Sequence, residues 1–379
     1  MMTDSSGMRR IYLDYNASTP IDPRVWDAMC TAGEGGEGNP SSTHWAGMAS
    51  KEVLERGRLQ IASVLGCSAE EVVLTSGGSE ANNLALKGVY FARRAPEAHL
   101  ITTQVEHPSI LSPCAFLERL GAKVTYLPVD RTGRVDPEDL RRAITSATVL
   151  ISVMHANNEV GTVQPIEACA RIAREHDILF HTDAAQTVGK ISTLVDALGV
   201  DLLSIAGHKL YAPKGVGALY VRAGTRLEPL IHGAGHEHGR RAGTESALLA
   251  AGLGAACEIA VDLSSMGPVR ELRDDLWSKL RTLLGEAVVL NGHPEHRLPN
   301  TLNVSFLRHV GADVLSALEG IAASTGSACH SGRVEFSPVL RAMGIPEEIG
   351  MGAIRFSLGR ATTADEIAEV AERLASVLH

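Results

Sequence analysis

Closely spaced cysteines and long apolar runs are both missing from this 379-residue chain, and each absence excludes a class of protein. The six cysteines are scattered without CxxC or any other tight spacing, so a disulfide framework is excluded and reduced thiols are predicted. No uninterrupted apolar run reaches the roughly 18 residues of a membrane span, and residues 1–10 lack the apolar core of a secretory signal. We therefore expect a soluble, cytoplasmic protein with no membrane partner.

Lysine is rare as well, and positive charge is in the minority. Seven of the 35 basic residues are lysines, so each lysine is a candidate wherever Schiff-base chemistry is needed. The 44 acidic residues leave a formal net charge of −9, which argues against direct binding of a nucleic-acid backbone. We expect the adjacent Arg240 and Arg241 to contact a partner subunit or a cofactor phosphate instead.

The composition that remains is typical of a folded globular protein. Hydrophobic residues make up 45% of the chain and charged residues 21%, and its length predicts two domains. Short aliphatic segments, predicted as strands, lie at 72–75, 99–103, 123–127, 149–154, 178–182, 202–205 and 217–221. Amphipathic segments of helix length lie between several of them, at 79–93, 109–120, 137–144 and 165–176. This alternation predicts an α/β fold whose mostly parallel sheet is sandwiched by helices.

The pattern changes after residue 261, where a predicted buried helix at 247–261 ends. Further on, helices are predicted at 268–284, 312–319 and 364–378, and strands at 288–290 and 300–306. We expect a large α/β domain at 11–261 and a smaller α+β domain at 262–379, with residues 1–20 packing near the smaller one. Ligands bind beyond the carboxyl ends of parallel strands, so the residues that follow each strand are the candidates for a site.

Two strand ends carry residues with a specific chemistry. Asp183 follows the strand at 178–182, and Lys209 follows the strand at 202–205. Such a pair suits pyridoxal phosphate, because the carboxylate keeps the ring nitrogen protonated and the lysine binds the aldehyde. Lys214 competes for the role of the aldehyde-binding lysine. The alternative to a cofactor site is that Asp183 is a capping residue and Lys209 is solvated.

A third strand end is a candidate anion site. The strand at 72–75 is followed by Ser76, Gly77, Gly78 and Ser79, and then by a predicted helix. Glycine lets backbone N–H groups approach a ligand, and the N-terminus of a helix attracts negative charge. An ordinary N-cap at Ser79 is the alternative interpretation.

Ten segments of the chain share their order and spacing with one family. They are 12–20 (YLDYNASTP), 38–42 (GNPSS), 75–80 (TSGGSE), 106–107 (EH), 155–161 (HANNEVG), 183–186 (DAAQ), 207–209 (GHK), 241–244 (RAGT), 326–329 (GSAC) and 355–360 (RFSLGR). In these segments the chain resembles the class V aminotransferase-like cysteine desulfurases. The resemblance extends from residue 11 to about residue 375. Cys329 lies 12 residues before Arg341, a spacing that resembles the housekeeping branch with a long cysteine loop.

The resemblance implies the fold of fold-type I pyridoxal-phosphate enzymes and a role for each matching residue. Lys209 is implied as the Schiff-base lysine and as the base that moves the α-proton, Asp183 as the partner of the ring nitrogen, and His107 as the residue that stacks on the ring. Further cofactor contacts are implied for Asn158 and Gln186 at the phenolic oxygen, for Gly78, Ser79 and His208 at the phosphate, and for Thr244 from the partner subunit of a homodimer. Arg355, assisted by Asn39 and Asn158, is implied to bind the substrate carboxylate, a task that suits a guanidinium.

Cys329 lies among small polar residues without periodicity, which predicts a flexible, exposed loop. Free cysteine is usually buried, so an exposed one suits a nucleophile, whereas the other five cysteines have helical or apolar contexts. His330 replaces the Thr or Ser common there in the family, and either it lowers the thiol pKa or it is simply solvated. Cys329 also becomes a candidate transient ligand of an iron–sulfur cluster in a partner complex.

Two other features bear on cofactor and metal binding. Ala206 stands where the family often has a phosphate-binding serine, so one donor is lost and cofactor retention is predicted to be weaker. His232, His236 and His238 suggest a metal cluster, but their glycine-rich segment matches the loop that leads to Thr244, so no metal site is expected.

The resemblance implies an enzyme that converts L-cysteine to L-alanine, forms a persulfide on Cys329 and passes the sulfur to an acceptor protein. Iron–sulfur assembly is the expected destination, with tRNA thiolation and DNA phosphorothioation left open. The alternatives are an aminotransferase, a selenocysteine or cysteine-sulfinate lyase on the same scaffold, or a non-catalytic sulfur-relay scaffold. Cys329 argues against simple transamination, and Lys209 together with Cys329 argues against an idle scaffold.

Overall fold

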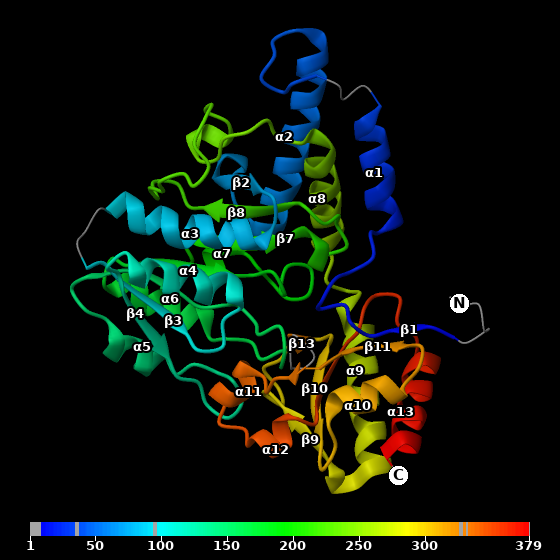
Figure 1. Ribbon diagram of the computed structural model, residues 1–379. Helices are drawn as coiled ribbons and strands as arrows, with labels where there is room; N and C mark the ends of the chain where they lie inside the picture. The colour runs from blue at the N-terminus through cyan, green and yellow to red at the C-terminus, as the bar shows by residue number, and fades with distance from the viewer. Residues whose placement is uncertain (1–8, 35–37, 94–96, 326–328, 331–332, 379) are drawn as a thin grey trace.

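The computed structural model describes residues 9–34, 38–93, 97–325, 329–330 and 333–378, and at 329, 330, 333 and 334 it describes the backbone alone. Figure 1 shows a larger part, in which helices flank a central sheet, above a smaller part that contains a second sheet and the C-terminal helix. Within the described residues, no helix combines the length and the apolar character needed to cross a bilayer.

The central sheet has seven strands in the order β2-β8-β7-β6-β5-β3-β4. They are β2 (Val72–Thr75), β3 (His99–Thr103), β4 (Lys123–Leu127), β5 (Thr148–Ser152), β6 (Leu179–Asp183), β7 (Leu202–Ala206) and β8 (Gly217–Val221). The pairs from β4 to β7 are parallel, whereas β8 runs antiparallel to both of its neighbours. The carboxyl ends of six strands and the start of β8 therefore meet at one edge of the sheet.

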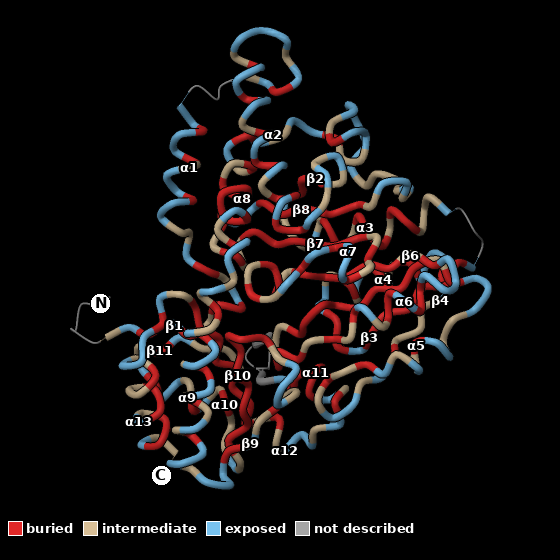
Figure 2. The backbone as a smooth tube through the Cα atoms, turned by 180° about the vertical axis from the view of Figure 1, so that it is seen from behind, coloured by how far each residue is buried: buried red, intermediate tan, exposed pale blue. Residues whose placement is uncertain are grey.

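Alternating side chains of the strands pack into two different hydrophobic clusters, as the pleat of a strand requires. Leu100, Leu150 and Leu202 belong to one cluster with helices α3 (Gly78–Arg93) and α4 (Pro108–Arg119). Ile101, Ile151 and Leu203 belong to the other. That second cluster includes side chains of α5 (Pro137–Ala143), α6 (Ile166–Glu175) and α7 (Val195–Leu198). Figure 2 shows the buried strands between more exposed helices, which confirms the predicted α/β sandwich.

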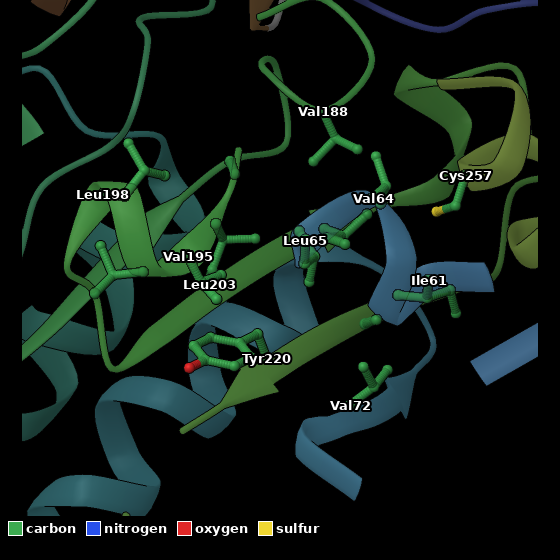
Figure 3. Close-up of a cluster of buried hydrophobic side chains, with 14 of the residues drawn as sticks. Ile61, Val64, Leu65, Val72, Val188, Val195, Leu198, Leu203, Tyr220 and Cys257 are labelled. Atoms are coloured by element: carbon green, nitrogen blue, oxygen red, sulfur yellow. The ribbon is translucent and has the colours of Figure 1, made fainter. Parts of the chain in front are cut away.

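Three long helices complete the second cluster: α1 (Pro23–Gly33), α2 (Trp45–Leu65) and α8 (Ala247–Ala260). Figure 3 shows Ile61 and Leu65 of α2 in one cluster with Leu203 and Tyr220 of the sheet. Helix α2 begins after His44, whose ring nitrogen accepts from the Gly47 amide, and ends at Gly66 in the left-handed conformation. The sequence predicts packing roles for the five cysteines other than Cys329; Cys257 is buried in this cluster, whereas Cys30 on α1 is exposed, so the prediction is wrong for Cys30.

The smaller sheet is antiparallel, with the strand order β12-β15-β10-β9. Its strands are β9 (Val288–Asn291), β10 (Thr301–Phe306), β12 (Ser324–Thr325) and β15 (Ala353–Ser357), and the helices beside it are α9 (Met266–Leu284), α10 (Gly311–Ala317) and α13 (Ala364–Leu378). Strand β1 (Ile11–Tyr12) pairs with β11 (Ile321–Ala322), and Ile11 and Leu13 pack into this part of the core. Two short helices, α11 (Pro338–Ala342) and α12 (Glu347–Gly350), complete the described chain.

Candidate active site

A cavity of about 530 Å³ opens at the sheet edge where the carboxyl ends of the strands meet. That volume lies within the usual range of small-molecule sites. Its lining includes nine of the residues predicted from the sequence, namely Gly78, Ser79, His107, Asn158, Asp183, Gln186, His208, Lys209 and Arg355. One cavity therefore brings together most of the predicted site.

Lys209 follows β7 in a short 3-10 helix, Gly207–Lys209, and points its amine into the cavity. The amine donates to the backbone carbonyls of Asn16 and Ala17. Burial, followed by the charge of Arg355, lowers the pKa of Lys209 to about 8, although Asp14 and Asp183 act in the opposite direction. A neutral amine, the form that attacks an aldehyde, is thus accessible near neutral pH.

The competing lysine, Lys214, also lines the cavity, but its side chain is exposed. Lys214 precedes β8, whereas Lys209 is close enough to Arg355, Asp14 and Asp183 for their charges to shift its pKa.

Asp183 ends β6, and only 6% of its surface is exposed. One carboxylate oxygen accepts from the Asn82 amide at 2.7 Å, and the other accepts from the Ala185 backbone at 2.9 Å. The same Asn82 nitrogen donates to Ser109 Oγ at 2.8 Å. Asp183 is therefore a fixed, buried carboxylate that faces an open cavity, and it suits a cationic ring nitrogen.

His107 is the N-cap of α4, and its Nδ1 accepts from the Ser109 amide at 3.1 Å. Its side chain is exposed toward the mouth of the cavity, yet the surrounding walls remove enough water to lower its pKa. Lys209 lowers this pKa further and Asp183 raises it. The neutral imidazole is favoured, and it can accept or return a proton.

The anion site predicted at the end of β2 has an open backbone. Gly77 has a φ of 149°, and a Cβ built there would have nothing within 4 Å, while Gly78 begins α3. Ala206 faces Gly78, where a Cβ would lie 3.1 Å from the Ala206 methyl group. An alanine therefore stands at the cavity wall opposite the helix N-terminus, and its effect on cofactor retention stays a prediction.

His208 lies beside this anion site as a neutral base. Burial, followed by the charges of Lys209 and Lys214, lowers the pKa of His208 to about 4. It therefore offers an anion a hydrogen bond rather than a positive charge.

Arg355 lies on β15 and reaches the cavity from the smaller sheet. Its Nη2 pairs with Asp14 at 2.7 Å, and its Nη1 donates to the Asn158 carbonyl at 3.0 Å. Its Nε is buried without a hydrogen-bond partner among the described residues. The guanidinium is thus anchored on one side and keeps a donor for another group, as a carboxylate-binding arginine requires.

Segment 14–19 is a part of the site that the sequence interpretation missed. Asn16 is 1% exposed, and its carbonyl accepts both from Lys209 and, at 3.0 Å, from the Gln186 amide. Its side chain donates to Thr301 Oγ1 at 2.8 Å and accepts from Asn300 at 3.0 Å. Asn82 was missed in the same way. For Asn16 the available signal was its place in the matching segment 12–20, which does not give the contacts, whereas Asn82 lies outside the matching segment 75–80.

Three predicted residues lie apart from the cavity lining. Asn39 is exposed and lines a separate surface depression near His236, and Thr244 is exposed on the same side. Cys329 belongs to the two-residue strand β13 (Cys329–His330), which pairs with β14 (Arg333–Val334), and its side chain and residues 326–328 lie outside the described part. Their assigned roles stay predictions.

One of the three histidines considered as metal ligands, His236, contacts a carboxylate. His236 Nδ1 bonds Glu245 at 2.8 Å. Over the part of the chain that the structure describes, no group of three or more metal-ligating side chains is found.

A half-buried lysine, a fixed aspartate and a helix N-terminus around one cavity of an α/β fold suit one class of enzyme, the pyridoxal-phosphate-dependent transferases. The aminotransferase class-V model matches residues 11–370. The chain belongs to this family, and within it to the cysteine desulfurases, as comparison with individual relatives shows.

Relatives and solved structures support this assignment over nearly the whole chain. The cysteine desulfurase IscS of Dictyoglomus turgidum is 48% identical over 363 residues, which cover 95% of this chain and 92% of that protein. A solved NifS-like protein is 38% identical with a TM-score of 0.91, over 97% of this chain and 99% of the other. The structure of SspA in complex with cysteine is 38% identical with a TM-score of 0.83, over 93% and 100%.

Proposed function

We propose that this protein is a cysteine desulfurase that binds pyridoxal 5'-phosphate in the cavity and converts L-cysteine to L-alanine. The observation that carries the proposal is that Lys209, Asp183 and Arg355 line one cavity. A relative solved with cysteine bound matches 93% of the chain, which supports L-cysteine as the substrate.

The donor set of the cavity fits the cofactor. Lys209 offers an amine with a pKa of about 8, and Asp183 offers a buried carboxylate. The Asn82 Oδ1 atom is buried without a partner among the described residues, and Gly77 leaves space for an anion at the N-terminus of α3. When bound, pyridoxal phosphate supplies an aldehyde that condenses with amines and a ring that withdraws electrons from the α-carbon of the substrate.

The residues of the chain then divide the work of orientation and proton transfer. Arg355 binds the substrate carboxylate, for which its Nε and Nη groups provide a planar pair of donors. Lys209 removes the proton from the substrate α-carbon and later holds it as an ammonium on the Asn16 and Ala17 carbonyls. His107 exchanges protons at the substrate side chain, because its neutral form is favoured.

Cys329 is proposed as the sulfur acceptor. Its thiolate attacks the substrate sulfur, so the substrate carbon–sulfur bond breaks as a sulfur–sulfur bond forms. The balance is L-cysteine plus the Cys329 thiol giving L-alanine plus a Cys329 persulfide, without an external oxidant or reductant. An acceptor thiolate then takes the outer sulfur by exchange.

A homodimer is proposed as the working form. Thr244 and Asn39 are exposed and lie outside the cavity of the single chain, so a partner subunit is needed to bring Thr244 to a cofactor phosphate. Cytoplasmic location and transient cluster binding at Cys329 are part of the same proposal.

Product analysis tests the activity. The purified protein is incubated with L-cysteine and a thiol reductant, and L-alanine, sulfide and pyruvate are measured. Equal amounts of alanine and sulfide are expected, whereas pyruvate or transamination products would favour an aminotransferase. A tenfold preference for selenocysteine or cysteine sulfinate would favour one of the lyases.

Two variants separate the roles of lysine and cysteine. In Lys209→Ala, borohydride is expected to fix no cofactor to the chain, and no alanine is expected to form. Cys329→Ser is expected to keep the fixed cofactor and lose the persulfide. A colourless wild-type protein that borohydride does not label would favour the non-catalytic scaffold.

We propose iron–sulfur assembly as the destination of the sulfur, on the strength of the 48% identity to a protein named IscS. Cys329→Ser, used as a trap in cell extract, is expected to retain an iron–sulfur scaffold protein. Recovery of a tRNA-thiolation or DNA-modification protein instead would overturn this assignment.

A further inference from the structure

A second lysine, Lys190, is buried directly behind the active-site cavity. It is 8% exposed, and it ends the turn that follows β6 and Asp183. Its amine donates to the Gln186 backbone carbonyl at 2.9 Å and to the Gln186 side-chain oxygen at 3.2 Å. It forms no ion pair within the described residues. Gln186 lines the cavity, whereas Lys190 does not.

Burial of the Lys190 amine lowers the stability of the fold, and packing alone does not require a lysine at this position. An ammonium without a carboxylate partner loses its hydration, and an apolar side chain of similar volume usually serves a fold better. Burial, followed by the charges of Lys209 and Arg355, lowers the pKa of Lys190 to about 7. A lysine in this place therefore needs a reason beyond folding.

The contacts of Lys190 determine which way the Gln186 amide faces. The amide nitrogen donates to the Asn16 carbonyl at 3.0 Å, while the amide oxygen accepts from Lys190. While the Lys190 amine is protonated, a flipped amide would place its NH₂ group against an ammonium and its oxygen against the Asn16 carbonyl, so both contacts would become repulsive. Asn16 lines the cavity and Lys190 does not, so the NH₂ edge is the one presented to the cavity.

We propose that Lys190 is a positioning residue that acts through Gln186, holding its amide so that the NH₂ group donates to an acceptor oxygen of the bound pyridoxal ring. The inference rests on the proposed function, because it takes the cofactor as the ligand. One NH₂ hydrogen is used by Asn16, and the second remains for the ligand. Lys190 thus adds to the site without touching cofactor or substrate.

The test is a double-mutant cycle on cofactor binding rather than on turnover. Apo-protein is titrated with pyridoxal 5'-phosphate, and the dissociation constant and absorption maximum are recorded for wild type, Lys190→Met, Gln186→Met and the double variant. Lys190→Met is expected to raise the dissociation constant about tenfold, the size of one lost buried hydrogen bond, and to shift the absorption maximum. In the Gln186→Met background the same change is expected to add nothing.

A control variant and a stability measurement complete the test. Lys123→Met removes an exposed lysine and is expected to leave binding unchanged, while the unfolding midpoint of apo Lys190→Met is expected to equal or exceed that of wild type. A Lys190→Met effect that persists without Gln186, unchanged binding, or failure of both Lys190→Met and Lys190→Gln to fold would overturn the inference. If the wild-type protein does not bind pyridoxal 5'-phosphate, the proposed function is wrong, and the inference that rests on it is wrong as well.

Discussion

At the scale of single residues, burial around the cavity shifts ionisable groups toward their neutral forms. It lowers the pKa of Lys209 to about 8 and that of His155 to about 4, and it raises the pKa of Glu106 to about 8. Groups that are poised near neutral pH exchange protons with little driving force in either direction. Of these three residues, Lys209 lines the cavity, and its pKa makes it a candidate proton carrier.

Glu106 provides the first prediction, which concerns stability and pH. Its Oε1 accepts from Thr103 at 2.9 Å and from the Met154 amide at 2.8 Å, while its Oε2 is buried without a partner among the described residues. The folded pKa of about 8 lies above the ordinary value of 4.5, so the protonated acid contributes stability that is complete below about pH 4.5 and is lost as the pH rises through 8. Glu106→Gln keeps the acceptor and removes the titration.

The expected result is that the stability of Glu106→Gln, relative to wild type, rises between pH 5 and pH 8 by up to about 1.4 kcal/mol per pH unit. Urea unfolding at four pH values measures it. Glu286→Gln, at an exposed position, is the matched control and is expected to follow wild type at each pH. A difference between Glu106→Gln and wild type that does not change with pH would contradict the prediction.

Asp14 provides a prediction about substrate affinity. Its carboxylate pairs with Arg355 at 2.7 Å and accepts from Ser324 at 2.9 Å, so a substrate carboxylate competes with it for the guanidinium. Asp14→Asn removes the competing charge and keeps a hydrogen-bonding side chain. We expect the KM for L-cysteine to fall about two- to fivefold with a nearly constant kcat, a change of the size of a partly exposed ion pair.

Steady-state kinetics and spectral titration with L-alanine measure this change. Ser324→Ala removes the second contact of Asp14 without altering charge and is expected to leave KM unchanged. A higher KM in Asp14→Asn would mean that Asp14 mainly orients Arg355 for its ligand.

The residues that sequence analysis could reach are those that follow strands. Lys209, Asp183 and His107 each come just after a predicted strand, and parallel strands bring such ends together. Asn16 and Asn82 could not be reached in this way, because their roles depend on contacts with residues far away in the sequence. Asn16, for example, bonds Thr301 across 285 positions.

At the scale of helices and strands, the elements with regular apolar patterns were predictable and α2 was not. The predicted helix at 79–93 differs by one residue from α3, and the strand at 72–75 coincides with β2. Helix α2 buries Ser50, Gly57 and Arg58, which interrupt its apolar period. Arg58 pairs with the buried Glu237 at 2.8 Å, a long-range partner that no local pattern reveals.

The contact between α2 and α8 gives a prediction about packing. A Cβ on Gly57 would lie 2.5 Å from the Ala250 carbonyl, and one on Gly254 would lie 2.6 Å from the Gly57 Cα. Gly57→Ala gains about 1 kcal/mol of helix propensity but must separate the helices. We expect a net loss of about 1–3 kcal/mol in the free energy of unfolding, measured by denaturant titration.

Gly267→Ala is the matched control for this helix contact. Gly267 lies in the first turn of α9, and a Cβ there would meet nothing within 4 Å. Its stability is expected to equal or slightly exceed that of wild type. If Gly57→Ala behaves like Gly267→Ala, the helices are free to move apart and close approach is not required.

At the scale of the whole molecule, segment 14–19 joins the two parts of the chain at the cavity. Asn16 contacts Lys209 and Gln186 of the larger part, and Asn300 and Thr301 of the smaller part. The fold class can be predicted from the sequence because the apolar periods of strands and helices depend on neighbouring residues. The contacts of segment 14–19 could not be predicted, because they join residues that are far apart in the sequence. The domain division at residues 261 and 262 stays a prediction.

Helices α1 and α2, which lie beside α8 in Figure 1, carry the three most exposed large apolar side chains of the described residues. Trp45 is 80% exposed, Leu59 is 60% exposed and Trp26 is 55% exposed. Where exposed apolar side chains form one patch, they favour an interaction site. Because the proposed role of Thr244 requires a partner subunit, we expect this surface to contact a second copy of the chain.

The resulting prediction is a dimer with twice the 40.2 kDa chain mass in analytical ultracentrifugation at micromolar concentration. Leu59→Arg places a charge in the proposed interface and is expected to yield monomers that bind pyridoxal phosphate more weakly, since the partner's phosphate contact is lost. Leu283→Arg, at an exposed position of α9 in the smaller part, is expected to remain dimeric. A monomeric wild type would contradict the assembly, whereas a dimeric Leu59→Arg would place the interface on another face and leave Thr244 without its proposed role.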